Sequence, residues 1–262
     1  MRKLSICIET FFTELPFLER IDQVAKRGFL GFEFWEWRGK DLKEVQKKAR
    51  ASGLEIAAIS GNRKNSLISP LEREGCVEEV KKSIEVAHQL DCPNLMIVTN
   101  KLAENGSVRI RYEYMNAKEK YINVIKSLRE LVAIAEKEDI LLLLEPLNSL
   151  VDHVGYYLDS TKDGFRIIDE VDSENLKLLY DVYHMQIMEG NLINTICENI
   201  DKIGYIHIAD VPGRHEPDTG EINFRKIHET LVRLKYNGFI GFELIPLTSS
   251  IEALEKIKSV FM

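Results

Sequence analysis

Residues 117–147 read AKEKYINVIKSLRELVAIAEKEDILLLLEPL, a helix-like stretch followed directly by a strand-like one. Up to Lys137 apolar residues recur every three to four positions, which predicts an amphipathic helix over 117–137. The apolar run that follows predicts a strand over 140–147. Because parallel strands need helical crossovers between them, this pairing is typical of an α/β fold with a parallel sheet.

The same alternation recurs through the whole chain. Strands are predicted over 4–9, 31–37, 54–60, 94–99, 140–147, 176–183, 205–210 and 239–245. Each is followed by a predicted helix, over 18–27, 42–51, 77–90, 117–137, 164–171, 192–203, 224–235 and 251–260. Eight such units in 262 residues match the usual length of one barrel. The sequence therefore predicts an α/β fold, a closed (β/α)8 TIM barrel built as a single domain over residues 1–262.

Charge and composition exclude several classes of protein. With 42 acidic and 35 basic residues the net charge is -7, which disfavours nucleic acid as a partner because a polyanion is repelled. Charges interrupt every apolar run before the roughly 18 residues that cross a bilayer, so no membrane partner is expected. The four cysteines form no CxxC pair and residues 1–9 hold no signal-peptide core, so we expect a cytoplasmic protein without a disulfide framework. The expected partner is a small molecule, and self-association through the helical shell is left open.

Polar residues interrupt the last four predicted strands near their C-terminal ends, where barrel active sites are built. They are Glu145, Asp181, His207 and Glu243. Any one of them alone reads as an isolated polar group or an ion-pair partner. Four in the same strand-end position favour a shared site, because carboxylates that converge repel one another unless a cation lies between them. Three carboxylates and one imidazole predict a single divalent ion, one of Mn²⁺, Mg²⁺, Co²⁺ or Zn²⁺.

Four segments carry a resemblance to a known family: LLEPLNSLVDHVGYYL (143–158), NLKLLYDVYHMQIMEGNL (175–192), IGYIHIADVPGRHEPDTGEINF (203–224) and GFIGFELIP (238–246). They resemble the hydroxypyruvate isomerases, within the xylose-isomerase-like barrels of sugar isomerases and epimerases. The resemblance implies metal ligands at Glu145, Asp181, His207 and Glu243, with the two glutamates also serving as catalytic acid and base. It implies an isomerase that interconverts hydroxypyruvate and tartronate semialdehyde.

One departure keeps a second substrate class open. Some hydroxypyruvate isomerases carry glutamine where this chain has His207, whereas the related ketose 3-epimerases carry histidine there. A ketose 3-epimerase of the tagatose or psicose type, or another sugar isomerase that uses the same site, is therefore the alternative. Glu33, Trp35 and Trp37, in GFEFWEWRGKD (31–41), match the family only loosely and are interpreted for the fold alone.

The chemistry of such a site follows from its carboxylates. Moving a carbonyl between adjacent carbons requires removal of a proton from the carbon that bears a hydroxyl, an enediolate, and return of a proton to the neighbouring carbon. Two positioned glutamates can do this, and a metal stabilises the developing enediolate charge. Glu145 and Glu243 are the candidate base and acid, and which of them acts first is left open.

Two further residues are predicted to bind substrate. His184 follows Asp181 by three residues and is expected to reach a substrate hydroxyl or to orient a ligand, the plainer reading being a structural loop histidine. Arg214, in the loop VPGRHEPDTGE (211–221), is expected to clamp a substrate carboxylate or to stabilise enediolate charge. The structural alternative is a surface ion pair with Glu216 or Asp218.

Other residues and other classes of protein are less favoured. Trp35 and Trp37 are read as packing, and Arg63 and Lys101 as surface charge. An endonuclease IV-like barrel needs more zinc ligands and a basic surface, which this acidic chain with six histidines does not offer. A non-catalytic sugar-binding barrel is disfavoured by the glutamate pair.

Overall fold

The computed structural model describes residues 3–103 and 105–262. Eight parallel strands pair in chain order, and the last pairs with the first, which closes the barrel. The strands are β1 (Lys3–Cys7), β2 (Gly31–Phe34), β3 (Glu55–Ser60), β4 (Asn94–Ile97), β5 (Leu141–Leu144), β6 (Leu176–Asp181), β7 (Ile203–His207) and β8 (Phe239–Phe242). The predicted TIM barrel is confirmed. The predicted single domain over 1–262 includes residues 1, 2 and 104, which lie outside the described residues, and it stays a prediction.

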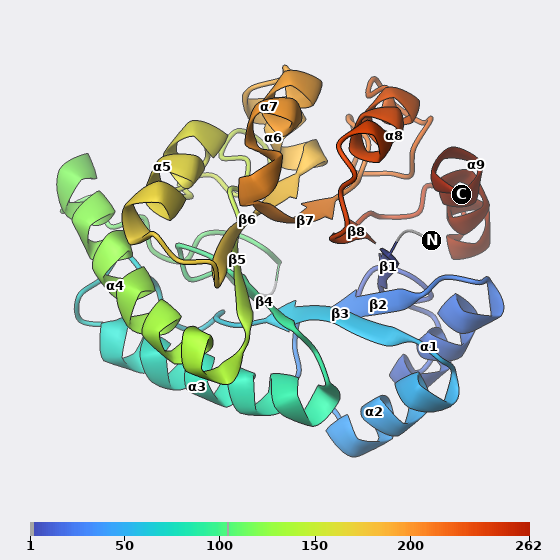
Figure 1. Ribbon diagram of the computed structural model, residues 1–262, viewed down its shortest axis with the longest axis horizontal. Helices are drawn as coiled ribbons and strands as arrows, with labels where there is room; N and C mark the ends of the chain where they lie inside the picture. Colours follow the sequence, from blue (N-terminus) through green and yellow to red (C-terminus); the bar gives the residue numbers. More distant parts are fainter. Residues whose placement is uncertain (1–2, 104) are drawn as a thin grey trace.

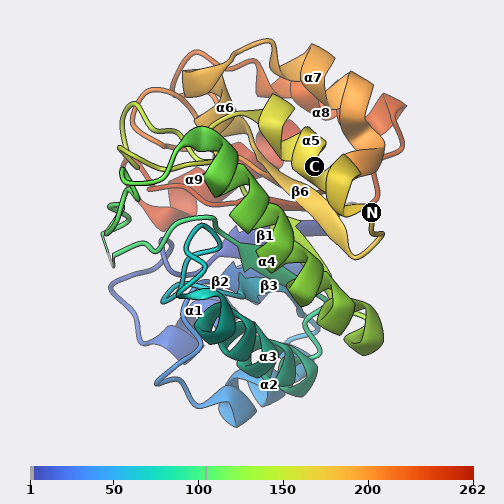
Figure 2. The same ribbon diagram turned by 90° about the vertical axis from the view of Figure 1, so that its left-hand side faces the viewer.

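Helices surround the strands, as Figure 1 shows, and the view in Figure 2 shows α3 and α4 packed side by side outside the barrel. The helices are α1 (Phe17–Lys26), α2 (Leu42–Ala51), α3 (Arg73–Leu90), α4 (Ala117–Glu138), α5 (Thr161–Val171), α6 (Val182–Met188), α7 (Leu192–Asn199), the 3-10 turn η1 (Ile200–Lys202), α8 (Phe224–Arg233) and α9 (Ser250–Phe261). None of the helices in the described part of the chain has the length and apolar character needed to span a membrane.

Several predicted boundaries are wrong, and the errors have physical causes. Four strands end three residues early, so that β2, β5, β7 and β8 stop at Phe34, Leu144, His207 and Phe242. Apolar residues beyond β5 and β8, Leu147 and Ile245, extended the predicted strands, but they line a cavity instead of continuing the ladder.

The segment around β6 and β7 differs most from the prediction. Helix α6 was not predicted, and it begins directly after Asp181, whose side chain caps it. The predicted helix 192–203 is split into α7 and η1, and its last residue, Ile203, already starts β7.

The barrel interior positions the polar strand ends. A small inner cluster includes Leu143 of β5, Leu179 of β6 and Tyr205 of β7. Successive side chains of a strand point to opposite faces, so the residue two positions later also points inward. Those residues are the polar ones, Glu145, Asp181 and His207. The polar residues of the site therefore lie directly above the inward-facing residues of the inner cluster, at the C-terminal mouth of the barrel.

Candidate active site

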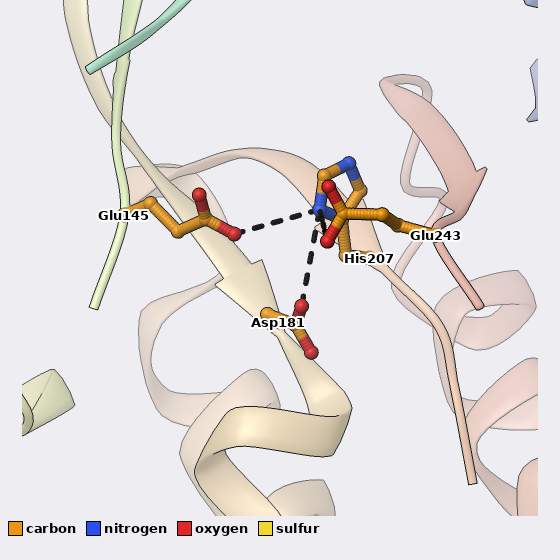
Figure 3. A group of neighbouring side chains, drawn as sticks. All are labelled: Glu145, Asp181, His207 and Glu243. Atoms are coloured by element: carbon orange, nitrogen blue, oxygen red, sulfur yellow. Dashed lines mark ion pairs between the residues drawn. The ribbon is translucent and has the colours of Figure 1, made fainter. Parts of the chain in front are cut away.

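The four predicted metal ligands come together at the mouth of the barrel, as Figure 3 shows. Each offers one ligand atom, and these atoms all lie within 4.8 Å of one another. The Nδ1 atom of His207 lies 3.5 Å from Oε1 of Glu145 and 3.8 Å from Oε2 of Glu243. It lies 3.9 Å from Oδ2 of Asp181. All four side chains are buried, so a cluster of carboxylates and imidazole that could hold a metal exists where the sequence predicted it.

The hydrogen bonds of the cluster test whether it fits a cation. Within residues 3–103 and 105–262, Oε1 of Glu145, Oδ2 of Asp181 and Nδ1 of His207 are buried without a hydrogen-bond partner. A buried polar atom left unsatisfied costs about 1–3 kcal/mol. The other oxygen of Asp181 is used locally, since Oδ1 accepts from the backbone N–H groups of Tyr183 at 2.8 Å and His184 at 3.1 Å. The unsatisfied atoms are those that a divalent ion would coordinate, and the donor set fits a hard or borderline ion.

His184 is fully buried beside the cluster, and Asn148 fixes its protonation. The side-chain oxygen of Asn148 accepts from the backbone N–H groups of Val151 at 3.0 Å and Asp152 at 2.9 Å. Its amide nitrogen must then face His184, and it donates to Nδ1 at 2.7 Å. The imidazole proton therefore sits on Nε2, 3.6 Å from Oδ2 of Asp181. Sequence reasoning missed Asn148, whose only signal was its place three residues after Glu145.

Arg214 reaches into the cluster from the loop after β7. Its Nη2 forms an ion pair with Oε2 of Glu243 and lies 3.8 Å from Oδ2 of Asp181. The plainer reading of Arg214, a surface ion pair with Glu216 or Asp218, is wrong. Glu216 is buried and accepts from the backbone N–H of Leu247 at 3.0 Å. Asp218 pairs instead with Arg225 at 3.3 Å.

The loop that carries Arg214 is held by one buried carboxylate, Asp210. Its oxygens accept from four backbone N–H groups, those of Val211, Thr219, Gly220 and Ile222. The N–H of Arg214 donates to the carbonyl of Asp210 at 3.0 Å, with a left-handed φ of 60° at Arg214. These hydrogen bonds give the loop a defined conformation, which directs the guanidinium of Arg214 toward Asp181 and Glu243.

Comparisons with known proteins identify the family. A family model described as the xylose isomerase-like TIM barrel matches residues 21–260. The chain belongs to this family. Hydroxypyruvate isomerase of Escherichia coli is 33% identical over 258 residues, which cover 95% of this chain and 96% of the relative. The 2-oxo-tetronate isomerase of Haemophilus influenzae is 30% identical over 266 residues, 97% of this chain and 98% of the relative.

A solved structure agrees with this xylose isomerase-like assignment. The structure described as AP endonuclease, family 2, from Brucella melitensis has a TM-score of 0.87 and 26% sequence identity, with 99% of both chains covered. The predicted resemblance to the hydroxypyruvate isomerases is confirmed by the relatives, and so is the prediction of an isomerase. The metal, the reaction and the role of each site residue stay predictions.

The cavity of this xylose isomerase-like barrel opens beside the cluster and has a volume of about 500 Å³. Glu145, Glu243, His184 and Arg214 all contribute to its wall. It is otherwise lined by Trp35, Ser60, Asn62, Arg63, Met96, Val98, Leu102, Asn105, Gly106, Leu147, Val151, Asp152, His153, Tyr183, Gly213 and Ile245. The four predicted catalytic and substrate-binding residues thus share one cavity.

Two residues read as packing or surface charge belong to this cavity. The indole Nε1 of Trp35 donates to Oε1 of Glu243 at 2.5 Å, so Trp35 holds a candidate catalytic carboxylate. The guanidinium carbon of Arg63 lies 5.7 Å from the Trp35 ring centre. Trp37 points elsewhere, because its Nε1 donates to the hydroxyl of Ser83 at 3.2 Å. Lys101 is not part of the cavity wall.

Burial and charge shift the protonation of the cluster. Burial raises the pKa of Asp181 to about 7, against the opposing charges of Arg214 and His207. Burial also raises the pKa of Glu145. Burial acts in the same direction on Glu243, but the charges of Arg214 and His207 and the hydrogen bond from Trp35 together outweigh it and hold the pKa of Glu243 below its usual value. A cation among the three carboxylates would favour the ionised form of each.

Proposed function

We propose that the chain is a metal-dependent isomerase of small hydroxy-carbonyl compounds, and that its substrate pair is hydroxypyruvate and tartronate semialdehyde. The observation that carries this proposal is the pair of buried glutamates, Glu145 and Glu243, in one cluster that could hold a metal at the end of a cavity. The names of two relatives support it, since hydroxypyruvate and 2-oxo-tetronate are both 2-oxo acids with a neighbouring hydroxyl.

In the proposed reaction the two glutamates move the carbon-bound proton. One carboxylate takes a proton from C3 of hydroxypyruvate, which leaves an enediolate, and the other carboxylic acid returns a proton to C2. The hydroxyl proton on O3 passes to O2, so the product is the aldehyde with no net gain or loss of atoms. A divalent ion held by Glu145, Asp181, His207 and Glu243 would stabilise the enediolate charge. The roles of the two glutamates exchange with the direction of the reaction.

His184 and Arg214 each direct an N–H group toward Oδ2 of Asp181, which lies 3.6 Å from Nε2 of His184 and 3.8 Å from Nη2 of Arg214. Nε2 of His184 and Nη2 of Arg214 lie 3.4 Å apart. Burial lowers the pKa of His184 well below its usual range, and the charge of Arg214 lowers it further. His184 is therefore a neutral donor toward a substrate oxygen, and Arg214 supplies the positive charge.

We expect Arg214→Met to act selectively on a substrate with a carboxylate. Loss of a desolvated contact between guanidinium and carboxylate costs about 2–5 kcal/mol, so kcat/KM for hydroxypyruvate should fall about 30-fold or more. Steady-state kinetics on hydroxypyruvate and on a neutral ketose test this. Arg50→Met, which removes an exposed ion pair with Asp91 away from the loop of Arg214, is the matched control. An equal loss on both substrates would mean that Arg214 acts through Glu243 and not as a carboxylate clamp.

A ketose 3-epimerase remains the second candidate because of the size of the cavity. Its volume of about 500 Å³ lies within the range that holds drug-sized ligands, so a six-carbon ketose has room in it. Such an enzyme removes and returns the proton on one carbon with the same glutamates.

A substrate panel decides between the two. We expect turnover of hydroxypyruvate with Mn²⁺ or Mg²⁺ and none without metal, measured by product analysis against 2-oxo-tetronate, psicose and tagatose. Epimerisation of a ketose without any action on hydroxypyruvate would overturn the proposed substrate and keep the metal and glutamate chemistry.

Three further expectations from the sequence stay predictions. These are the cytoplasmic location, the lack of a nucleic-acid partner and the lack of a membrane partner. Self-association stays open. An endonuclease IV-like site would need more metal ligands than this. The group that could hold a metal, in the described part of the chain, has four members, one of them a histidine.

A further inference from the structure

Glu33 of β2 lies beneath the metal cluster, fully buried inside the barrel. Its Oε1 is 2.9 Å from Nε2 of His207. Its Oε2 accepts from the hydroxyl of Tyr205 and, at 3.3 Å, from the hydroxyl of Ser5. Among the residues that the structure describes, His207 is its only ion-pair partner. The reading of Glu33 for the fold alone is therefore incomplete.

The backbone of β8 makes room for this arrangement at Gly241. A Cβ atom there would lie 2.7 Å from Oε2 of Glu33 and 2.8 Å from Cδ2 of His207. It would also lie 2.7 Å from Cε1 of Tyr205. These contacts leave no space for a side chain at position 241. The side chains of Glu33, Tyr205 and His207 therefore pack directly against the backbone of Gly241. The position of Glu33 is built into the barrel.

The contact fixes which nitrogen of His207 faces the cluster. In the described chain Nε2 of His207 and Oε1 of Glu33 are both buried without a hydrogen-bond partner, and the 2.9 Å ion-pair contact joins these two atoms. A carboxylate oxygen can only accept, so the imidazole proton belongs on Nε2. The lone pair is then on Nδ1, the atom that faces the three carboxylates in Figure 3.

We propose that Glu33 is a positioning residue that selects the Nε2–H form of His207 and thereby sets the affinity of the cluster for a divalent ion. A carboxylate behind a ligating imidazole fixes its ring and raises its basicity. The inference rests on the proposed function in one respect, that the cluster binds a metal.

The variant Glu33→Gln tests the proposal. If the amide oxygen stays with the two hydroxyls, the amide N–H faces Nε2 and drives the imidazole proton to Nδ1, which then cannot bind metal. If the amide turns, the contact with His207 survives without its charge. Either way we expect the Kd for Mn²⁺, measured by calorimetry on metal-stripped protein, to rise about 10- to 100-fold.

Three companion variants show whether the effect passes through His207. Glu79→Gln neutralises another buried carboxylate, one that holds the loop at Arg63 to Asn65, and should leave the Kd unchanged. Tyr205→Phe removes a hydroxyl from Oε2 and should raise the Kd by a smaller factor. In a His207→Ala background Glu33→Gln should add nothing, because the residue through which it acts is gone.

The outcomes separate this inference from the metal site itself. A Kd for Glu33→Gln within threefold of the wild-type value overturns the inference and leaves the metal site standing. A loss that persists in the His207→Ala background also overturns it. If Glu33→Gln does not fold, an unchanged Kd for Tyr205→Phe decides against it. A wild-type protein that binds no Mn²⁺ overturns the metal site and the inference together.

Discussion

Glu145→Gln and Glu243→Gln are each expected to lower kcat by about 100- to 10,000-fold, the range that one positioned acid or base contributes. The amide keeps the shape of the side chain and a coordinating oxygen but can no longer accept or deliver the proton. Steady-state kinetics at saturating Mn²⁺ measure the effect, with metal content determined on the same samples. Glu229→Gln, which removes an exposed salt bridge to Lys226, is the matched control and should retain wild-type activity.

Metal content makes this result interpretable, because both glutamates are also candidate ligands. A variant that holds one ion per chain and has lost turnover has lost the proton-transfer group. A variant that is inactive only because it is empty should recover as the Mn²⁺ concentration rises. Near-normal turnover by either metal-loaded variant would remove that glutamate from the proton path.

Exhaustive chelation is expected to reduce isomerase activity to background, and Mn²⁺ or Mg²⁺ to restore it. The physical reason is that the enediolate charge would develop beside three buried carboxylates that repel it, and a divalent ion would offset this negative charge. Elemental analysis before chelation should give one divalent ion per chain. A protein that keeps full activity after the metal is removed would contradict the proposed chemistry.

The same chelation should lower thermal stability. An ion that binds only the folded state stabilises it by about 2.7 kcal/mol at a free concentration of 100 times Kd. Differential scanning calorimetry with and without Mn²⁺ measures this shift, and His207→Ala should show a smaller one.

The cluster that could hold a metal was predictable because each of its residues breaks a local rule. Glu145 and Asp181 are carboxylates in apolar strands, and the barrel brings successive strand ends to one mouth. Their partners were not predictable in this way. Trp35 meets Glu243 across 208 residues of sequence, and Tyr205 meets Glu33 across 172. The sequence pattern of one strand does not predict which side chain of a distant strand will contact it once the barrel closes.

The loops set a second limit on prediction from sequence. The choice of Arg214 between a surface ion pair and the cluster depends on the turn built around Asp210. Strand ends were misplaced at Leu144 and Phe242 because apolar residues serve the cavity wall as well as the ladder. Apolar character alone does not distinguish these two uses.

The most direct test of the proton-transfer account is turnover of hydroxypyruvate in D₂O by the Mn²⁺-loaded wild type, followed by NMR. We expect deuterium at C2 of tartronate semialdehyde and at C3 of recovered hydroxypyruvate, because protons on Glu145 and Glu243 exchange with solvent. An enzyme-free sample corrects for spontaneous exchange, and the two Gln variants should not exceed it. Product that forms with no deuterium at C2 under any condition would contradict proton transfer through glutamates that exchange with solvent, and would point to a shielded proton relay or a hydride shift.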